Sequence, residues 1–152
     1  MHDVRLRAIT GDNWRQAILL EVDKTQTAFV PSNLFSLAQA VYEPGYYPCG
    51  VYHEGKMIGF VMYRGVEMGD YTLWYIARFM IDRFSQGQGL GRATLNAVLR
   101  RLRNRHSADG VLISYVPGNT AAKRLYTEMG FVDESLLWDD EICLVYRFAE
   151  AW

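Results

Sequence analysis

The chain is poor in cysteine, with two among 152 residues. Cys49 and Cys143 lie far apart, neither belongs to a CxxC pair, and apolar or aromatic residues flank both. A disulfide framework or a cysteine metal site has closer, patterned spacing, whereas a free cysteine behaves as a small buried hydrophobe. The three histidines are scattered without ligand spacing. We therefore expect two buried free thiols, a reducing compartment and no bound metal.

Long apolar runs and a strong net charge are also missing. No uninterrupted apolar run approaches the roughly 18 residues of a membrane span, and charges interrupt residues 1–7, where a signal peptide needs apolar residues. The formal net charge of −1 argues against binding a bulk polyanion. We interpret the basic cluster of Arg100, Arg101, Arg103 and Arg105 as a helix end, where the macrodipole favours cations. These absences predict a cytoplasmic protein with no membrane or nucleic-acid partner.

Linkers, repeats and low-complexity segments are absent as well. Half of the residues are hydrophobic and 14% are aromatic, which is enough to bury a core without disulfides. The stretch from Pro44 to Pro48 is too short to join independent domains. We expect a single domain over residues 1–152, with an N-terminal arm carrying two acceptor-side helices at 4–66, a cofactor-binding core at 71–131 and C-terminal strands at 131–152.

Hydrophobic periodicity predicts the elements of this domain. Helical spacing follows Asp12 or Asn13 as far as Val22, and again from Asn33 to Val41. Alternating and short apolar runs predict strands at 4–9, 49–53, 57–66, 71–81, 111–115, 131–137 and 141–148. Two further helices are expected, one after the glycines near residue 90 and one at 120–129. Because a strand, helix, strand passage requires a parallel crossover, we expect an α/β (α+β) fold, with a mixed, mostly antiparallel sheet of about six or seven strands and about four helices.

A glycine-rich loop opens one of these helices. Gln86-Gly87-Gln88-Gly89-Leu90-Gly91 leads directly into Arg92 and a run of helix formers. Glycines remove the Cβ atoms that would keep a ligand from the backbone, and a helix N-terminus presents unpaired amides to an anion. The run is neither a P-loop nor GxGxxG. It predicts a diphosphate site, although a tight turn alone is the alternative.

A second pattern follows about thirty residues later. Asn119, Ala122 and Tyr126 are spaced to lie along one face of a helix, and Gly130 can close that helix with Phe131 packing back onto it. A packed amphipathic helix is the alternative for this segment alone. The two patterns together, on either side of a strand, favour a ligand site.

The loop and this helix resemble those of the GNAT superfamily of acetyl-CoA-dependent N-acetyltransferases. Gln86 to Gly91 matches its Gln/Arg-x-x-Gly-x-Gly/Ala loop, and Asn119 to Phe131 matches its following helix. Residues 52–63 and 76–82 look most like those of bacterial spermidine/spermine N-acetyltransferases. The resemblance implies a direct acetyl transfer from acetyl-CoA to a primary amine of a small molecule, such as a polyamine.

The resemblance also implies roles for individual residues. The strand at Phe79, Met80 and Ile81 would hold the pantetheine arm, with a backbone amide near the oxyanion. The loop amides of Gln86, Gly87, Gln88, Gly89, Leu90, Gly91 and Arg92 would take the pyrophosphate. Asn119 and Ala122 would line the arm. Tyr126 would bind the cofactor and protonate the leaving thiolate.

The acceptor side is less defined by the sequence. Some polyamine acetyltransferases carry an acidic residue where this chain has Ala77, so the group that takes the ammonium proton stays open, with Glu67, Asp70, Glu21 and Asp23 as candidates. Six aromatic residues suggest a walled pocket: Trp14, Phe29, Phe35, Tyr42, Tyr46 and Tyr47. A protein lysine or N-terminal acetyltransferase and a non-catalytic acyl-CoA-binding module remain alternatives. A sheet edge near the C-terminus and exposed aromatics suggest a homodimer.

Overall fold

The computed structural model describes residues 2–138 and 140–149; residues 1, 139 and 150–152, which fall within the predicted single domain and its C-terminal part, lie outside the described residues. The elements run β1 (Val4–Ala8), α1 (Trp14–Leu19), the 3-10 turn η1 (Lys24–Gln26), α2 (Asn33–Tyr42), β2 (Tyr46–His53), β3 (Lys56–Met68), β4 (Tyr71–Ile81), the 3-10 turn η2 (Arg83–Ser85), α3 (Leu90–His106), β5 (Gly110–Tyr115), α4 (Thr120–Glu128), β6 (Val132–Trp138) and β7 (Glu141–Arg147).

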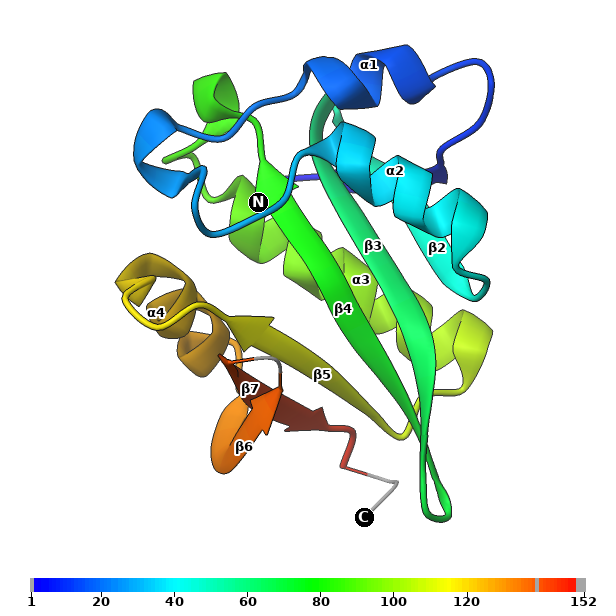
Figure 1. Ribbon diagram of the computed structural model, residues 1–152, viewed down its shortest axis with the longest axis vertical. Helices are drawn as coiled ribbons and strands as arrows, with labels where there is room; N and C mark the ends of the chain where they lie inside the picture. The colour runs from blue at the N-terminus through cyan, green and yellow to red at the C-terminus, as the bar shows by residue number, and fades with distance from the viewer. Residues whose placement is uncertain (1, 139, 150–152) are drawn as a thin grey trace.

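The strands of the described chain form one seven-stranded sheet in the order β1-β2-β3-β4-β5-β7-β6. All neighbouring pairs are antiparallel except β4 and β5, which are parallel and joined through α3. The predicted mixed sheet with one parallel crossover is therefore confirmed. Figure 1 shows β4 and β5 side by side at one end and diverging toward the other.

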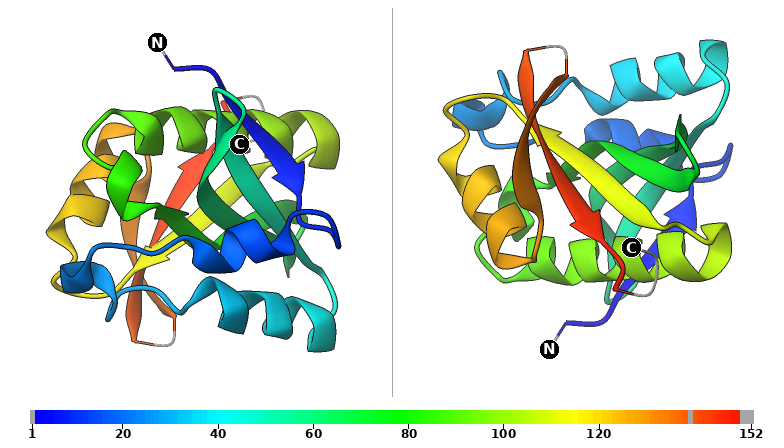
Figure 2. Two further views of the ribbon diagram at one scale, coloured as in Figure 1. Left: turned by 90° about the horizontal axis from the view of Figure 1, so that it is seen from above. Right: turned by 90° about the horizontal axis from the view of Figure 1, so that it is seen from below.

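Helices cover both faces of the sheet. Figure 2 shows α1 and α2 on one side and α3 on the other. The interior strand β3 is buried continuously from Met57 to Tyr63 because alternate side chains enter two cores. Phe60 and Met62 pack toward α1 and α2, whereas Val61 and Tyr63 join the larger core.

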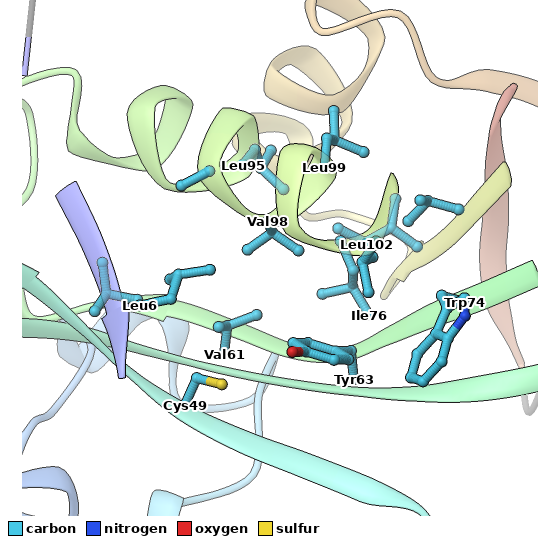
Figure 3. Close-up of a cluster of buried hydrophobic side chains, with 14 of the residues drawn as sticks. Leu6, Cys49, Val61, Tyr63, Trp74, Ile76, Leu95, Val98, Leu99 and Leu102 are labelled. Atoms are coloured by element: carbon cyan, nitrogen blue, oxygen red, sulfur yellow. The ribbon is translucent and has the colours of Figure 1, made fainter. Parts of the chain in front are cut away.

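The larger core lies between the sheet and α3. Leu95, Val98, Leu99 and Leu102 recur at helical spacing and pack onto strand side chains such as Ile76 (Figure 3). Arg101 reaches back to the sheet, where it donates to the carbonyl of Leu6 at 2.7 Å and to the sulfur of Cys49 at 3.5 Å. At least one arginine of the predicted basic cluster therefore serves packing. Cys49 and Cys143 are buried and free, as expected.

Two element boundaries differ from the prediction by three residues. The first helix ends at Leu19 rather than Val22, because Leu20 is extended, with ψ of 136°. Strand β2 begins at Tyr46 rather than Cys49, and so includes Pro48. Pro48 pairs with Met62 of β3, while its carbonyl accepts from the Ile9 amide, so its backbone groups face the β1 side just past the end of the β1–β2 ladder. The missing N–H of proline is therefore tolerated there.

Candidate active site

The candidate site is a cleft where β4 and β5 part. The parallel ladder joins Leu73–Ile76 of β4 to Gly110–Ile113 of β5, and β4 then continues to Ile81 beside β3 alone within the described chain. A cavity of about 570 Å³ opens in this gap, bounded by the glycine loop, α4 and the segment before α2.

A β-bulge turns the end of β4 away from β5. Met62 pairs with Arg78 and the next residue, Tyr63, pairs with Ile76, so Ala77 is the extra residue. A bulge bends its strand and increases the local twist. Ala77 thus marks the point where the ladder to β5 ends and the cavity begins.

The backbone of β4 beyond the bulge faces this cavity. The amide of Asp82 donates to the carbonyl of Ile58 on β3. Successive residues of a strand point their backbone groups to opposite edges, so the amides of Phe79 and Ile81 face the gap. Hydrogen-bonding groups at an open strand edge suit an extended chain carrying amides.

The glycine loop lies at the wide end of the cleft. Gly87 and Gly89 have φ of +76° and +79°, a conformation that glycine adopts without strain. Gly89 is the N-cap of the 17-residue α3 and no side chain caps the helix. The first amides of α3 are therefore left for a ligand, and the helix dipole favours an anionic one.

The loop is held in place by its first residue. The side-chain amide of Gln86 donates to the carbonyl of Ile81 and to the side-chain oxygen of Gln26, both at 2.9 Å. It therefore joins the end of β4, the start of the loop and η1. A Cβ atom on Gly91 would lie 3.5 Å from Leu125, so the loop packs closely on α4.

The second predicted motif forms α4. Asn119 is its N-cap and accepts from the amide of Ala122 at 3.2 Å, while Gly130 has φ of +104° and the Phe131 amide donates to the carbonyl of Tyr126. These contacts fix the height of Tyr126, whose ring lies between those of Phe79 and Phe131 at 6.2 and 6.1 Å.

Tyr126 lines the cavity although its side chain is almost fully buried. Its hydroxyl has no hydrogen bond from the described residues. Burial, then the nearby Glu141 and Tyr75, raise the pKa of Tyr126 well above its usual value. The phenol therefore stays protonated at neutral pH and can donate a proton to a developing anion.

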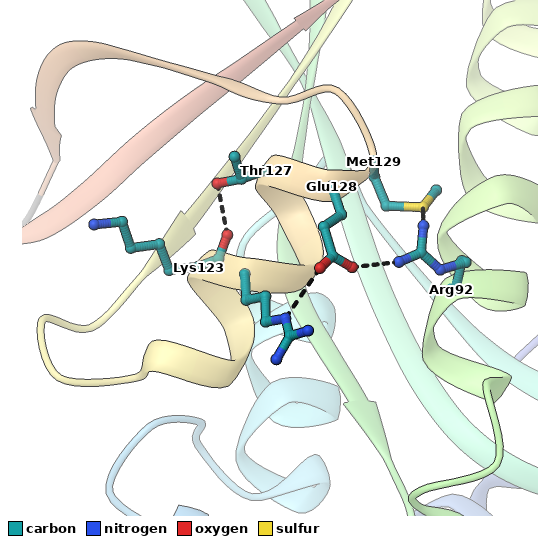
Figure 4. Close-up of polar contacts among 6 residues, drawn as sticks. Arg92, Lys123, Thr127, Glu128 and Met129 are labelled. Atoms are coloured by element: carbon teal, nitrogen blue, oxygen red, sulfur yellow. Dashed lines mark hydrogen bonds and ion pairs between the residues drawn. The ribbon is translucent and has the colours of Figure 1, made fainter.

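The structure brings together most of the predicted site residues. Those that line the cavity are Phe79, Met80, Ile81, Gln86, Gly87, Gly89, Leu90, Gly91, Asn119, Ala122 and Tyr126. Gln88 and Arg92 do not line it. The Arg92 side chain instead pairs with Glu128 at 2.5 Å, and this ion pair joins α3 to α4 (Figure 4). Glu128 also binds Arg124 of its own helix.

The acceptor side is walled by α2 and the segment that precedes it. Phe29 and Tyr46 line the cavity, but the other four predicted wall aromatics do not. Phe35 and Tyr42 point to solvent from α2, and Tyr47 stacks on Tyr63. Sequence spacing cannot tell the inner from the outer face of a helix that is apolar on both.

None of the four carboxylates considered as proton acceptors lines this cavity. Glu67 and Asp70 line a separate hollow at the far end of the β3–β4 hairpin. Asp23 caps η1 by accepting from the Thr25 amide, and Glu21 lies 4.0 Å from Arg83. All four carboxylates therefore lie outside the cleft.

Sequence reasoning missed an acidic residue that does line the cavity. Glu141 begins β7, and its Oε1 accepts from the Ser114 hydroxyl of β5 at 3.3 Å. The available signal was the antiparallel pairing of the two strands at 111–115 and 141–148, which places the start of one beside the end of the other.

No group of three metal-ligating side chains occurs within residues 2–138 and 140–149. No helix in this part of the chain is both long and apolar enough to cross a membrane.

Comparison with known proteins agrees with this geometry. A family model described as the acetyltransferase (GNAT) family matches residues 11–131. A probable spermine N(1)-acetyltransferase of Bacillus subtilis subsp. natto is 34% identical over 134 residues, covering 84% of this chain and 87% of the relative. The spermine/spermidine N(1)-acetyltransferase of Bacillus subtilis shares the same identity and coverage.

Solved structures share the fold. The aminoglycoside acetyltransferase AAC(6')-Ib in complex with coenzyme A superposes with a TM-score of 0.79 at 18% identity, covering 98% of this chain and 96% of that one. The GNAT domain of S. lividans PAT superposes with a TM-score of 0.76 at 16% identity, covering 95% of this chain and 90% of that one. The chain belongs to the GNAT family and is an acetyl-CoA-dependent N-acetyltransferase.

Proposed function

We propose that this enzyme acetylates a primary amine of a small aliphatic polyamine such as spermidine or spermine. The observation that carries the proposal is the 34% identity to spermine and spermidine N(1)-acetyltransferases over most of both chains. A cavity walled on the acceptor side, rather than an open groove, also favours a slender amine over a protein substrate.

The end of β4, the glycine loop and α4 form one half of the cleft, the donor half. We assign this half to acetyl-CoA, which supplies an activated acetyl group when bound. The residues present fit this cosubstrate: uncapped amides follow Gly89 for a diphosphate, and the open edge of β4 at Phe79 and Ile81 suits the amides of the pantetheine arm. The Asn119 oxygen is engaged in capping α4, which leaves its NH₂ group for a ligand. Gln88 and Arg92 contribute through the loop backbone.

We assign Tyr126 as the proton donor to the leaving thiolate. Tyr126 lines the cavity, and a raised pKa keeps its hydroxyl protonated. The backbone amides of Phe79 and Ile81 are the donors placed to stabilise negative charge on a carbonyl oxygen in the gap. The amine attacks directly, since neither buried cysteine lines the cavity.

An acceptor panel tests the substrate. Thiol release from acetyl-CoA should be followed with spermidine, spermine, short diamines, aminoglycosides, amino acids and lysine peptides. We expect the highest kcat/KM with spermidine or spermine. Preferential use of a lysine peptide would favour the protein-acetylating alternative, and coenzyme A binding without turnover of any amine would favour the non-catalytic module.

Two further properties belong to this proposal. A cytoplasmic location is supported by the two free thiols, which persist in a reducing compartment. A homodimer is supported by the exposed apolar side chains of α2, such as Leu34, Val41 and Tyr42. Light scattering after gel filtration should give twice the monomer mass.

A further inference from the structure

Glu141 is the one acidic side chain that lines the cleft among the described residues. It comes from β7, across the cavity from the acceptor wall, and its carboxylate takes part in a chain of hydrogen bonds. The Tyr75 hydroxyl of β4 lies 2.6 Å from the Ser114 oxygen of β5, and Ser114 donates to Glu141 Oε1 at 3.3 Å.

The direction of this chain is fixed by proton count. A serine hydroxyl has one proton, so Ser114 can donate to Glu141 only if it accepts from Tyr75. Burial raises the pKa of Tyr75, which keeps it a donor at neutral pH. All three side chains line the cavity, and the chain therefore ends on the carboxylate.

The negative charge of Glu141 affects the pKa of other side chains in and near the site. It contributes to raising the pKa of Tyr126 on α4, of Tyr75 on β4 and of Cys143 on its own strand. Two cations, Arg78 of β4 and Arg64 of β3, line the same cavity from the acceptor side. Arg78 is committed to Ser36, Gln39 and the Ala77 carbonyl.

One carboxylate oxygen is left over. Glu141 Oε2 has no hydrogen bond or ion pair from the part of the chain that the structure describes. A carboxylate with only one weak partner at the border of a cavity favours the binding of a cationic ligand. The ligand's charge-assisted hydrogen bond replaces the water that the carboxylate loses when the cavity is filled.

We propose that Glu141 binds the reacting ammonium group of the acceptor and takes its proton, an inference that rests on the proposed amine acetylation. The N–H bond breaks and the proton moves to the carboxylate, which leaves a neutral amine with a lone pair. The nitrogen then forms the new C–N bond as the C–S bond breaks, and the sulfur leaves with the Tyr126 proton. The second nitrogen proton restores Tyr126 through solvent, and Glu141 releases the first to water.

This role gives a physical reason for Ala77. Ala77 at the bulge of β4 and Glu141 on β7 line the same cavity, so one carboxylate on β7 can serve the acceptor without an acidic residue on β4. Two carboxylates sharing one site would raise the pKa of one of them and weaken it as an anion.

The test compares Glu141→Gln with Glu67→Gln, whose carboxylate lies in the separate hollow. With the best amine of the panel, kcat/KM of Glu141→Gln at pH 7 should fall by about 100-fold or more, as expected for a lost general base. The loss should shrink toward pH 10, because an alkyl amine with a pKa of about 10.4 then arrives unprotonated. Glu67→Gln should match the wild type.

Binding gives a second readout that needs no turnover. Calorimetry with coenzyme A present should show amine affinity reduced by about 10-fold or more in Glu141→Gln, which is the loss of one charge-assisted hydrogen bond, with unchanged coenzyme A affinity. Glu141→Asp should recover part of both properties, which a purely structural role would not require.

Wild-type kcat/KM in Glu141→Gln, or a loss independent of pH together with normal amine binding, overturns the assignment. If spermidine and spermine are not used but another amine is, the polyamine proposal fails while Glu141 is tested with that amine. If no amine is acetylated, the calorimetric comparison with spermidine still decides whether Glu141 holds an ammonium group.

Discussion

Arg78 and Gln39 join the two halves of the cleft: Arg78 Nη2 donates to Gln39 Oε1 at 2.8 Å, between β4 and α2. Arg78 Nε also donates to the Ser36 hydroxyl of the same helix at 3.1 Å. The acceptor wall is therefore anchored to the strand that borders the donor half. A substitution of Gln39 changes this contact from the side of α2 and leaves the residues of β4 unchanged.

Gln39→Leu should weaken amine binding and spare coenzyme A. The substitution removes a hydrogen bond to a charged group, worth about 1.5–3 kcal/mol, and loosens α2 against β4. We expect KM for the amine to rise roughly 10-fold, with coenzyme A affinity unchanged by calorimetry. Exposed Gln16 on α1 provides a control, Gln16→Leu. Equal losses for both substrates would contradict this separation of roles.

Tyr126→Phe should lower turnover with little change in stability. The hydroxyl has no hydrogen bond from the described residues, so its removal breaks no internal contact. We expect kcat to fall about 100-fold or more, the usual share of a general acid. Single-turnover rates with saturating substrates, beside thermal unfolding of both proteins, measure the two effects. A rate equal to that of the wild type would remove Tyr126 from the chemistry.

Gly89→Asp should abolish coenzyme A binding, because it places bulk and negative charge at the uncapped start of α3. Gly69→Asp is a matched control, since Gly69 also has a positive φ, of +62°, but lies in the far hairpin turn with nothing within 4 Å of an added Cβ. Titration calorimetry should find affinity lost in the first and kept in the second. Retained affinity in Gly89→Asp would refute the loop as the diphosphate site.

Stability should decline at alkaline pH, in part through Tyr63. Burial raises the pKa of Tyr63 to about 12. An unfolded tyrosine ionises near pH 10, so above about pH 10 the unfolded chain binds fewer protons and the free energy of unfolding falls as pH rises toward 12. This contribution is complete below pH 10 and disappears as pH passes 12.

Tyr63→Phe should make that alkaline decline shallower. Denaturant unfolding at about pH 8 and about pH 11 measures it, and the linkage relation predicts a smaller difference for the variant. Tyr42→Phe, at an exposed tyrosine of α2, serves as the comparison. An unchanged difference in Tyr63→Phe would show that other groups govern alkaline unfolding.

Local patterns predicted the elements that carry the donor half. The alternation from Tyr71 to Ile81 gave β4 with its observed bounds, since flanking turn residues delimit a strand within a few positions. Gly130 predicted the end of α4, because a left-handed stop is encoded by a single residue. Asn119 was expected only as a ligand residue on the face of this helix, and it also forms its N-cap.

Features that depend on long-range register were not predicted. The bulge at Ala77 adds one residue to a ladder whose partner is a different strand, so no local signal announces it. Glu141 enters the cavity through its pairing with β5, and an acidic residue beside a turn has the same local pattern as any surface carboxylate. Phe35 and Phe29 look alike in the sequence, yet only Phe29 lines the cleft.

The parting of β4 and β5 has a consequence for how such an enzyme diversifies. Its donor half is built from main-chain amides and from glycines of positive φ, which few substitutions can replace without loss of binding. The acceptor half depends on individual side chains from α2, β5 and β7. Substitutions that redirect the enzyme to a new amine are therefore expected to accumulate on one wall of the cleft while the other keeps its shape.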